Sequence, residues 1–481
     1  MTDWEVVIGL EIHCQLSTET KLFCGCSTKF GDSVNSNICP VCTGQPGALP
    51  VMNKKAVEYA VKAGLALNCR VNPKNVFARK NYFYPDLPKG YQISQLDLPI
   101  VEDGWIEVTK GNGDVKKIGI TRAHMEEDAG KLVHIGSERI HGSTGSMVNL
   151  NRACTPLIEI VSEPDMRTAE EARLFVEKVR DIVRFLGICD GNMEEGSLRC
   201  DANVSIMPRG SKEYGTKTEV KNMNSFKSIE AAIEAEIERQ IDVVESGERI
   251  IQATMHYDEN TGRTYMLRSK EEAMDYRYFP EPDLVPIVIS KEWVDEIKST
   301  MPQLPEQRKS RYIDDYGLSE YDAGVLLLDR EISDFYDETV KLGADPKKVC
   351  NWVMGEISSY LNANDLSIAQ SKVTPAYLHE LLELIANETI SGKIAKTVVE
   401  KVFETGNSPS KVVDAEGLKQ VDNTDEIRAI LEKLVSENPG PIQQLREGNN
   451  KVMGFFVGQV MKETQGKANP QSVNKIIKEL L

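Results

Sequence analysis

Alternating apolar and polar positions recur through the first 290 or so residues and predict β-strands. In the stretch from Gly9 to Leu16, Glu11, His13 and Gln15 stand between apolar residues. Because successive side chains of a strand point to opposite faces, these three polar side chains share one face. The acid and the imidazole are therefore about 7 Å apart, two strand rises along the chain.

Four further stretches of this kind each place a carboxylate on a strand. They are Thr121–Gly130 with Glu127, Pro156–Val161 with Glu159, Leu198–Ile206 with Asp201, and Lys217–Lys221 with Glu219. If the first is extended, Glu127 falls on the same face as Met125. Glu159 stands inside an otherwise apolar strand, where a lone charge is costly unless it binds a cation or a hydrogen-bond partner.

The pattern changes after about residue 290, where apolar residues recur with the helical period. Helices are predicted at Lys291–Lys298, Glu306–Tyr316, Ser319–Leu328, Glu331–Leu342, Lys347–Leu361 and Thr374–Ala386. The turn residues Thr405–Ser410 separate a last small helical segment. The sequence thus predicts an α+β protein with a β-rich domain at 1–292, a helical domain at 293–406 and a helical tail domain at 407–481.

Composition narrows the class of protein. The chain has 481 residues, a formal net charge of −17 and ten cysteines. Its longest apolar runs are far shorter than the ~20 residues that cross a bilayer, and no secretory signal precedes the first strand, so we expect a cytoplasmic protein. The acidic total argues against non-specific coating of nucleic acid. From Arg446 to Leu481, however, six basic residues stand against three acidic ones. This segment is either a solvated helix face or a docking surface for an acidic polymer.

Four cysteines form two close pairs, Cys24 with Cys26 and Cys39 with Cys42. Thiols on two such turns can converge on Zn²⁺ in a closed tetrahedral site, which is structural and not catalytic. The one-residue spacer of the first pair is less common than two residues, so four free thiols remain the alternative. The other six cysteines show no ligand spacing and are expected in the core.

The predicted polar strand face combines carboxylates with Arg199, Lys217 and Lys221. This composition suits Mg²⁺, which bridges substrate phosphates with one or two carboxylates, while the cations offset phosphate charge. The chain has no Gly-x-x-x-x-Gly-Lys-Ser/Thr loop, kinase signature or Gly-x-Gly-x-x-Gly after a strand. Any nucleotide site is therefore of an unusual kind, and surface ion pairs are the alternative.

An aromatic and basic stretch, Arg79–Gln95, contains Tyr82, Phe83, Tyr84 and Lys89. Aromatic faces can stack a base or an aminoacyl end, while lysine and glutamine supply hydrogen bonds. The alternative is a rigid loop with packed tyrosines.

Several long segments, in this order along the chain, resemble the B subunit of the aspartyl/glutamyl-tRNA amidotransferases, the GatB family. They are Val7–His13, Lys80–Asp86, His124–Lys131, Met193–Asn203, Asp275–Asp283 and Gly466–Pro470. The resemblance implies a cradle-like catalytic domain. It also implies a heterotrimer with the A subunit, an amidase that releases ammonia from glutamine, and a small C subunit. The GatB chain would use ATP and Mg²⁺ to phosphorylate the side-chain carboxylate of Glu on tRNA(Gln) or Asp on tRNA(Asn), and ammonia would displace the phosphate.

The resemblance also implies roles for individual residues. The metal and phosphoryl-transfer site would consist of Glu11, His13, Glu127, Glu159, Asp201 and Glu219. Lys89 would lie near the ammonia path, and the paired cysteines would hold structural zinc. The strand pattern and the aromatic stretch, in turn, make four residues candidates for cofactor binding, in contact with the nucleotide or the aminoacyl end: Lys217, Lys221, Arg199 and Tyr82. Cys154 departs from the family, which usually has glycine at that position.

Two alternatives belong to other classes. A non-catalytic RNA-binding protein would tolerate Glu11→Ala or Asp201→Ala. A stand-alone metal-dependent phosphohydrolase would turn over ATP without charged tRNA or partner proteins.

Overall fold

The computed structural model describes residues 3–135, 144–269, 276–419, 424–446, 452–464, 468 and 470–480. It divides into an N-terminal unit, Met1–Leu304, and a C-terminal unit, Pro305–Leu481. Some residues of the segments named above lie outside the described residues: Asp275, Gly466, Asn469 and, in the basic segment from Arg446 to Leu481, Glu447, Lys451, Lys467 and Leu481. The predicted α+β class is confirmed by the large sheet of the first unit and the helices of both units.

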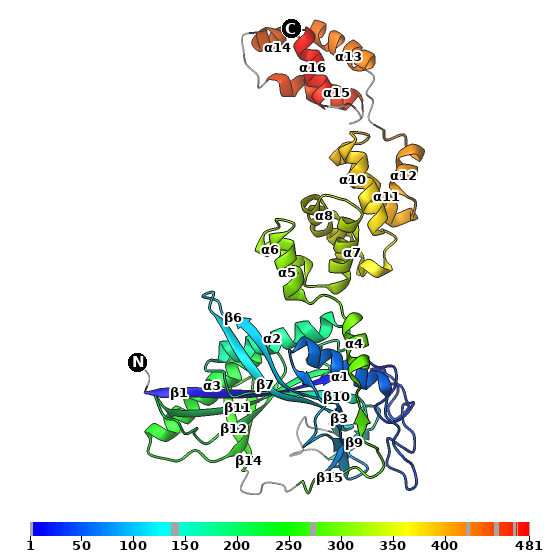
Figure 1. The fold of residues 1–481 in the computed structure, drawn as a ribbon. Coiled ribbons are helices and arrows are strands. Elements are labelled where there is room, and N and C mark those ends of the chain that lie inside the picture. Colours follow the sequence, from blue (N-terminus) through cyan, green and yellow to red (C-terminus); the bar gives the residue numbers. More distant parts are fainter. Residues whose placement is uncertain are drawn as a thin grey trace. The chain divides into compact units, whose positions relative to one another are not determined.

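A nine-stranded sheet forms the centre of the N-terminal unit (Figure 1). Its strands, in spatial order, are β14 (Arg263–Ser269), β13 (Ala253–Asp258), β12 (Thr218–Met223), β11 (Leu198–Pro208), β1 (Trp4–Gln15), β10 (Pro156–Ser162), β7 (Val115–Glu127), β6 (Val101–Thr109) and β2 (Arg70–Val71). All neighbours are antiparallel except β12 and β13, which are parallel. The five stretches predicted as carboxylate-bearing strands correspond to β1, β7, β10, β11 and β12.

The apolar face of β1 is buried, as the alternation predicts. Leu10, Ile12 and Cys14 are at most 1% exposed and pack with helix residues such as Phe175 and Ile233. The helices of this unit are α1 (Lys54–Ala66), α2 (Ala169–Phe185), α3 (Phe226–Glu245) and α4 (Lys291–Ser299). With one face covered by apolar helix residues, the polar side chains of β1 project from the other face of the sheet.

Shorter strands complete the N-terminal unit. They form a three-stranded sheet of β15 (Phe279–Pro280), β4 (Ala78–Asn81) and β5 (Tyr91–Ser94), and two pairs, β16 (Ile287–Val288) with β3 (Lys74–Asn75) and β8 (Lys131–Ile135) with β9 (Gly145–Asn149). The predicted aromatic stretch thus contains β4, β5 and the loop between them, which positions Lys80 and Tyr82.

The described part of the C-terminal unit is helical. Its helices are α5 (Pro305–Asp314), α6 (Glu320–Leu326), α7 (Arg330–Lys341), α8 (Pro346–Trp352), the π-helical η2 (Val353–Ile357), α9 (Ser358–Asn364), the 3₁₀ turn η3 (Ile368–Gln370), α10 (Pro375–Ala386), α11 (Gly392–Thr405), α12 (Pro409–Ala415), α13 (Thr424–Glu437), α14 (Pro439–Arg446), α15 (Met453–Glu463) and α16 (Pro470–Leu480). Helix-forming segments agree with the sequence pattern to within a few residues. None of the described helices has the length and apolarity needed to cross a membrane.

Hydrophobic clusters show how the chain is divided by packing. One cluster extends from Val6 to Leu304 and includes Ile297 of α4. A second extends from Tyr312 to Leu418, so it includes Val413 of α12, and a third comprises residues of α13 to α16. The division at 292 and 406 stays a prediction from the sequence.

A buried carboxylate on α3 ties β12 to the edge strand β14. Glu236 is fully buried and accepts hydrogen bonds from Thr218 of β12 at 2.7 Å and Thr264 of β14 at 2.7 Å. Arg239 donates to the same carboxylate at 2.9 Å. Burial raises the pKa of Glu236, but the hydrogen bonds from Arg239 and Thr218 outweigh this effect and hold the pKa below its ordinary value.

Glu236→Ala is expected to lower the free energy of unfolding by about 3 kcal/mol, because it leaves the buried hydroxyl of Thr218, the half-buried hydroxyl of Thr264 and the Arg239 guanidinium without this acceptor. Urea denaturation of the full chain measures this. Glu238→Ala, at an exposed position of the same helix, should change it by less than about 0.5 kcal/mol. Equal effects of the two changes would contradict the role given to Glu236.

Candidate active site

The polar face of β1 brings the predicted site residues together because this strand lies between β10 and β11. Glu11 is opposite Asp201 of β11, and His13 is opposite Glu159 of β10. The alternation predicted which side chains share the face. The antiparallel register decides which of them meet.

Three carboxylates form the first cluster, defined as Glu11, Asp201 and Glu219. Their oxygens lie within 4.8 Å of one another. Asn203 donates to Glu11 at 3.0 Å and Thr254 donates to Glu219 at 3.0 Å, which orients both acids. The Lys221 ammonium pairs with Asp201 and lies 3.2 Å from Glu219. A set of carboxylate oxygens with fixed orientation and an adjacent lysine suits a hard cation and the phosphate that it accompanies.

The second cluster, defined as His13, Glu126 and Glu159, also has ligand atoms within 4.8 Å of one another. Glu159 Oε2 lies 3.2 Å from the Nε2 of His13 and 3.2 Å from the Nε2 of His124. Burial raises the pKa of Glu159, but the charges and hydrogen bonds of the His124 and His13 rings outweigh it and hold the pKa well below its ordinary value. Burial also opposes the protonation of His13, yet Glu159, Glu126 and Asp201 raise the pKa of its ring to about 9. In the metal-free chain the cluster is an ion network.

The His13 ring should make the stability of the metal-free chain depend on pH. Its folded pKa lies above the unfolded value of 6.5, so its stabilising contribution is complete below pH 6.5 and is lost as pH rises through about 9. Thermal unfolding in EDTA between pH 6 and 9.5 measures the decline. His13→Gln should give a flatter profile, and identical profiles would rule out this role for the ring.

Two cavities adjoin these clusters. The larger, of about 420 Å³, is bounded by His13, Glu126 and Asp201, together with Lys80, Tyr82, Arg199 and Lys221. The second, of about 300 Å³, is bounded by Glu11, Asn203, Ser205, Tyr214 and Lys217. The four residues predicted to contact nucleotide or aminoacyl end therefore all line one of the two cavities, three of them the larger one. Glu11 and His13 are consecutive residues on the polar face of β1, so the two cavities follow one strand.

A buried aspartate organises the cationic side of the larger cavity. Asp128 accepts from Arg199 at 3.0 Å and from Gln15 at 2.8 Å, and Arg152 Nε lies 3.5 Å away. The two arginines overcome the effect of burial and lower the pKa of Asp128. Arg199 and Arg152 both line the cavity, where they can attract an anionic substrate.

Glu127 lies on the opposite side of β7 from Glu126 and belongs to neither carboxylate cluster. It pairs with Lys89, and the backbone N–H of Ile93 donates to its carboxylate at 2.8 Å. The structure thus brings five of the six predicted metal ligands to the two clusters, and places Glu127 with Lys89 behind them. Gln92 connects the pair to the larger cavity, because it lines that cavity and donates to the carbonyl of Glu127 at 2.7 Å.

The sequence did not single out Lys80, His124, Glu126, Asp128 or Arg152. Glu126 and His124 could have been found by the period-two rule, since they alternate with Glu127 and Met125 on β7. Nothing in the local pattern marks Lys80 or Arg152 for the cavity, because both reach it through long-range folding.

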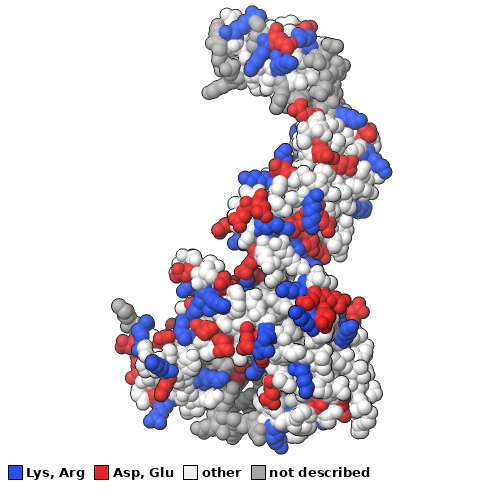
Figure 2. All heavy atoms as spheres, in the orientation of Figure 1, with Lys and Arg blue, Asp and Glu red and all other residues white. Residues whose placement is uncertain are grey.

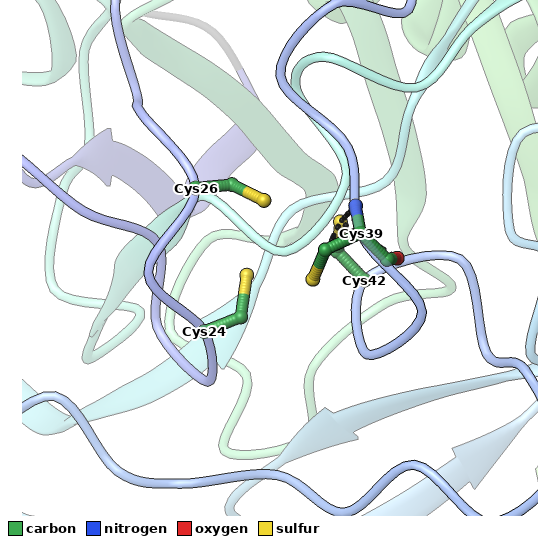
Figure 3. Close-up of side chains that lie close together, drawn as sticks. All are labelled: Cys24, Cys26, Cys39 and Cys42. Atoms are coloured by element: carbon green, nitrogen blue, oxygen red, sulfur yellow. Dashed lines mark hydrogen bonds between the residues drawn. The ribbon is translucent and has the colours of Figure 1, made fainter.

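The four paired cysteines converge in space (Figure 3). Cys24 and Cys26 come from one loop and Cys39 and Cys42 from another, and the four sulfurs lie within 4.8 Å of one another. Without a cation, burial and neighbouring thiols raise the pKa of Cys26 to about 11, while contact with Cys24 and burial raise that of Cys42 to about 12. Four thiols held this closely ionise together only when a cation neutralises them, so the donor set fits Zn²⁺.

Cys154 has a left-handed backbone, with φ +69°, and is 2% exposed. This conformation costs a non-glycine residue roughly 1 to 2 kcal/mol, which explains why a glycine suits the position. Its amide donates to the carbonyl of Asp128 at 2.8 Å, so the strained residue supports the arginine-binding aspartate.

On the face of the N-terminal unit drawn in Figure 2, charge does not mark a single binding patch. Figure 2 shows Lys and Arg side chains interspersed with Asp and Glu over the visible face of the N-terminal unit. On this face the acidic excess of the sequence is therefore not gathered into one patch.

Comparisons with known proteins identify relatives over nearly the whole chain. Residues 6–295 match the GatB/GatE catalytic domain and residues 334–481 match the GatB domain. The chain is 56% identical over 474 residues to the aspartyl/glutamyl-tRNA(Asn/Gln) amidotransferase B subunit of Geotalea uraniireducens, covering 98% of each chain. It is 54% identical over 481 residues to the protein of that name from Carboxydothermus hydrogenoformans, covering 100% of this chain and 99% of the relative. The corresponding protein of Thermodesulfovibrio yellowstonii is 53% identical over 478 residues, covering 99% of each chain.

Proposed function

The chain belongs to the GatB family, the B subunits of the aspartyl/glutamyl-tRNA amidotransferases, and we propose that it phosphorylates the side-chain carboxylate of a misacylated tRNA before amidation. The substrate is Glu-tRNA(Gln), Asp-tRNA(Asn) or both. The observation that supports this chemistry best is the pair of clusters, each capable of holding a cation, two residues apart on β1 beside two cavities.

Phosphorylation solves the chemical problem of this amidation. A carboxylate oxygen is a poor leaving group, whereas phosphate leaves readily from an acyl phosphate when ammonia attacks the carbonyl carbon. The transfer brings several negative charges together, and fixed cationic groups must offset them. Lys221, Arg199 and Lys80 line the larger cavity and supply such groups.

The two clusters differ in the cation that they suit. Glu11, Asp201 and Glu219 offer only oxygen ligands, so they would hold Mg²⁺. When bound, Mg²⁺ would offset the negative charge of the transferred phosphoryl group. His13, Glu126 and Glu159 combine an imidazole with two acids and would form a second cation site after His13 loses its proton.

The ATP and the aminoacyl end would occupy the two cavities along β1. The larger cavity has aromatic and cationic walls, with Tyr82 and Arg199, and suits the aminoacyl adenosine of the tRNA 3′ end. The smaller cavity adjoins the carboxylate cluster and Lys217, and suits the nucleotide. In this arrangement Glu11 and His13 would both be within reach of the transferred phosphoryl group.

Ammonia would come from glutamine through an amidase partner, the A subunit, in a heterotrimer with a small C subunit. The buried Lys89 and Glu127 pair lies behind the larger cavity and would border the ammonia path. By this proposal, residues 1–292 contain the chemistry, 293–406 form a helical domain, and the tail domain 407–481 contacts tRNA through basic residues such as Lys475 and Lys478.

The cysteine cluster would hold one structural Zn²⁺. All four ligand positions come from the protein, so no position is open for substrate. The metal would instead fix the loops from Cys24 to Cys42 against the sheet.

Reconstitution with the amidase and the small third protein, ATP, Mg²⁺ and Glu-tRNA(Gln) or Asp-tRNA(Asn) tests the proposal. Amide should form on the tRNA. When the ammonia source is omitted, ATP hydrolysis should still require the charged tRNA. Release of ADP that is indifferent to the charged tRNA would refute phosphorylation of the aminoacyl group, and would favour a simple phosphohydrolase.

A further inference from the structure

Lys21 is a fully buried lysine at the base of the cysteine cluster. Its side chain has no solvent exposure. The backbone N–H of Lys21 donates to the carbonyl of Cys26 at 3.0 Å, and its ammonium donates to the carbonyl of Asn37 at 2.7 Å and of Leu150 at 3.3 Å. The residue therefore contacts the loop of the first cysteine pair and the loop that leads to the second.

The ammonium of Lys21 has no anionic partner among the described side chains. Its two observed acceptors are neutral carbonyls. A buried charge without a counter-charge costs several kcal/mol, and a protein normally pairs or neutralises such a group. By contrast, other buried charged side chains of this unit, such as Glu127 and Glu171, pair with lysines. Lys21 thus needs an anion that no described carboxylate supplies.

The cysteine cluster supplies that anion once it holds zinc. Four thiolates around one Zn²⁺ have a net formal charge of −2. Asn37, which accepts from the ammonium, stands two residues before Cys39, and the backbone N–H of Lys21 donates to the carbonyl of Cys26, so the lysine lies against both cysteine loops. The positive charge of Lys21, its burial and its contacts with both cysteine loops are therefore those expected of a counter-ion for this centre.

We propose that Lys21 is the counter-ion of the zinc–thiolate centre and that its positive charge raises the affinity of the site for zinc. The inference rests on the zinc site of the proposed function. It goes beyond that function, because it assigns to a residue that is not a ligand the role of stabilising the negative charge of the centre. Metal ligands commonly depend on such outer contacts.

Lys21 also connects the centre to the wall of the larger cavity. Leu150, one of its acceptors, is two residues from Arg152, and the backbone N–H of Leu150 donates to Asn35 Oδ1 at 2.7 Å. The backbone N–H of Asn37, the other acceptor, donates to Asn151 Oδ1 at 3.0 Å. Loss of zinc should therefore loosen the segment that ends in Arg152.

The test compares zinc retention in purified full chain. Lys21→Met removes the charge and the donors, whereas Lys21→Gln removes the charge and keeps an amide donor. Zinc content is measured by elemental analysis, and release is followed with a chromophoric chelator. We expect one zinc per chain in the unaltered protein and release about ten-fold faster or more from both variants, because about 1.4 kcal/mol of lost attraction corresponds to ten-fold. Lys29→Met is the matched control, since the side chain of Lys29 is 76% exposed in the same loop.

The outcomes separate the charge from a packing role. Thermal unfolding in EDTA should show little difference between Lys21→Gln and the unaltered chain, since the apo site offers no anion. In zinc the variant should unfold at a lower temperature. Release from Lys21→Gln at the rate of the unaltered chain, or an equal loss of stability with and without zinc, would overturn the proposal. An unaltered chain without zinc would instead refute the zinc site itself, and the inference with it.

Discussion

Replacing Glu11 by glutamine is expected to lower amide formation about a thousand-fold, or ~4 kcal/mol of transition-state stabilisation. The change removes one anionic ligand from the carboxylate cluster while the amide keeps the volume of the side chain. Asn203, which donates to Glu11 at 3.0 Å, would then face a group that can present a donor instead of an acceptor. Steady-state amidation of Glu-tRNA(Gln) by the reconstituted complex measures the effect.

The control for this experiment is Glu5→Gln. Glu5 lies on the same face of the same strand, and it pairs with Arg167 at 3.0 Å, outside both cavities. The Glu5→Gln variant should retain activity within about two-fold, because loss of one surface ion pair has a small energetic effect. Raised Mg²⁺ should restore part of the Glu11→Gln activity if the site is weakened and not destroyed. Full activity of Glu11→Gln at ordinary Mg²⁺ would show that the cluster does not hold the catalytic cation, and would favour the RNA-binding alternative.

The second large effect is expected at Lys89. Lys89→Met should reduce the rate of glutamine-dependent amidation roughly a hundred-fold. A small misplacement of a reactant, here ammonia, relative to the reacting carbon lowers a rate by about this factor. Ammonia crossing a buried region keeps its hydrogen bonds only where fixed polar groups replace water, and Lys89 with Glu127 supplies such groups behind the cavity. Amidation driven by free ammonium chloride should fall much less. Parallel assays with glutamine and ammonium measure the ratio.

Breaking a buried ion pair also destabilises the fold by about 3 to 5 kcal/mol, so stability must be measured separately. Lys89→Met with Glu127→Gln should recover most of that loss and leave the glutamine-dependent defect in place. Lys116→Met is a matched control, because Lys116 pairs with the buried Glu171 at 2.7 Å elsewhere in the same unit. If the double variant recovers both stability and the glutamine reaction, the pair is structural and does not border the ammonia path.

The sequence predicted the elements of the site more completely than their contacts. Period-two alternation placed Glu11, His13 and Gln15 on one face because one side of β1 must be buried, and that side is set by Leu10 to Leu16. Alternation also implies that Glu126 and Glu127 lie on opposite faces of β7. The alternation could not predict which of these two glutamates lies near the histidines. Both Glu126 and Glu127 are buried, so neither side of β7 is marked as the exposed one.

Contacts between distant segments could not be predicted from local pattern. His124 meets Glu159 because β7 and β10 pair in a given register, and that register depends on the whole sheet. Lys80 and Arg152 reach the cavity from a short strand and a loop. The cysteine pairs were an exception, because their spacing alone restricts the geometry that they can adopt.

The central position of β1 has a consequence for synthesis of the protein. Asn203 and Glu11, which share a hydrogen bond, are 192 positions apart, and β1 pairs on both sides with strands made much later. At the usual rate of translation the first strand waits roughly 10 to 40 s for its neighbours. During that interval its two unpaired edges can associate with other chains. A nascent chain stopped before β11 would expose them indefinitely, so chaperone demand should be greatest early in translation and fall once residue 208 has left the ribosome.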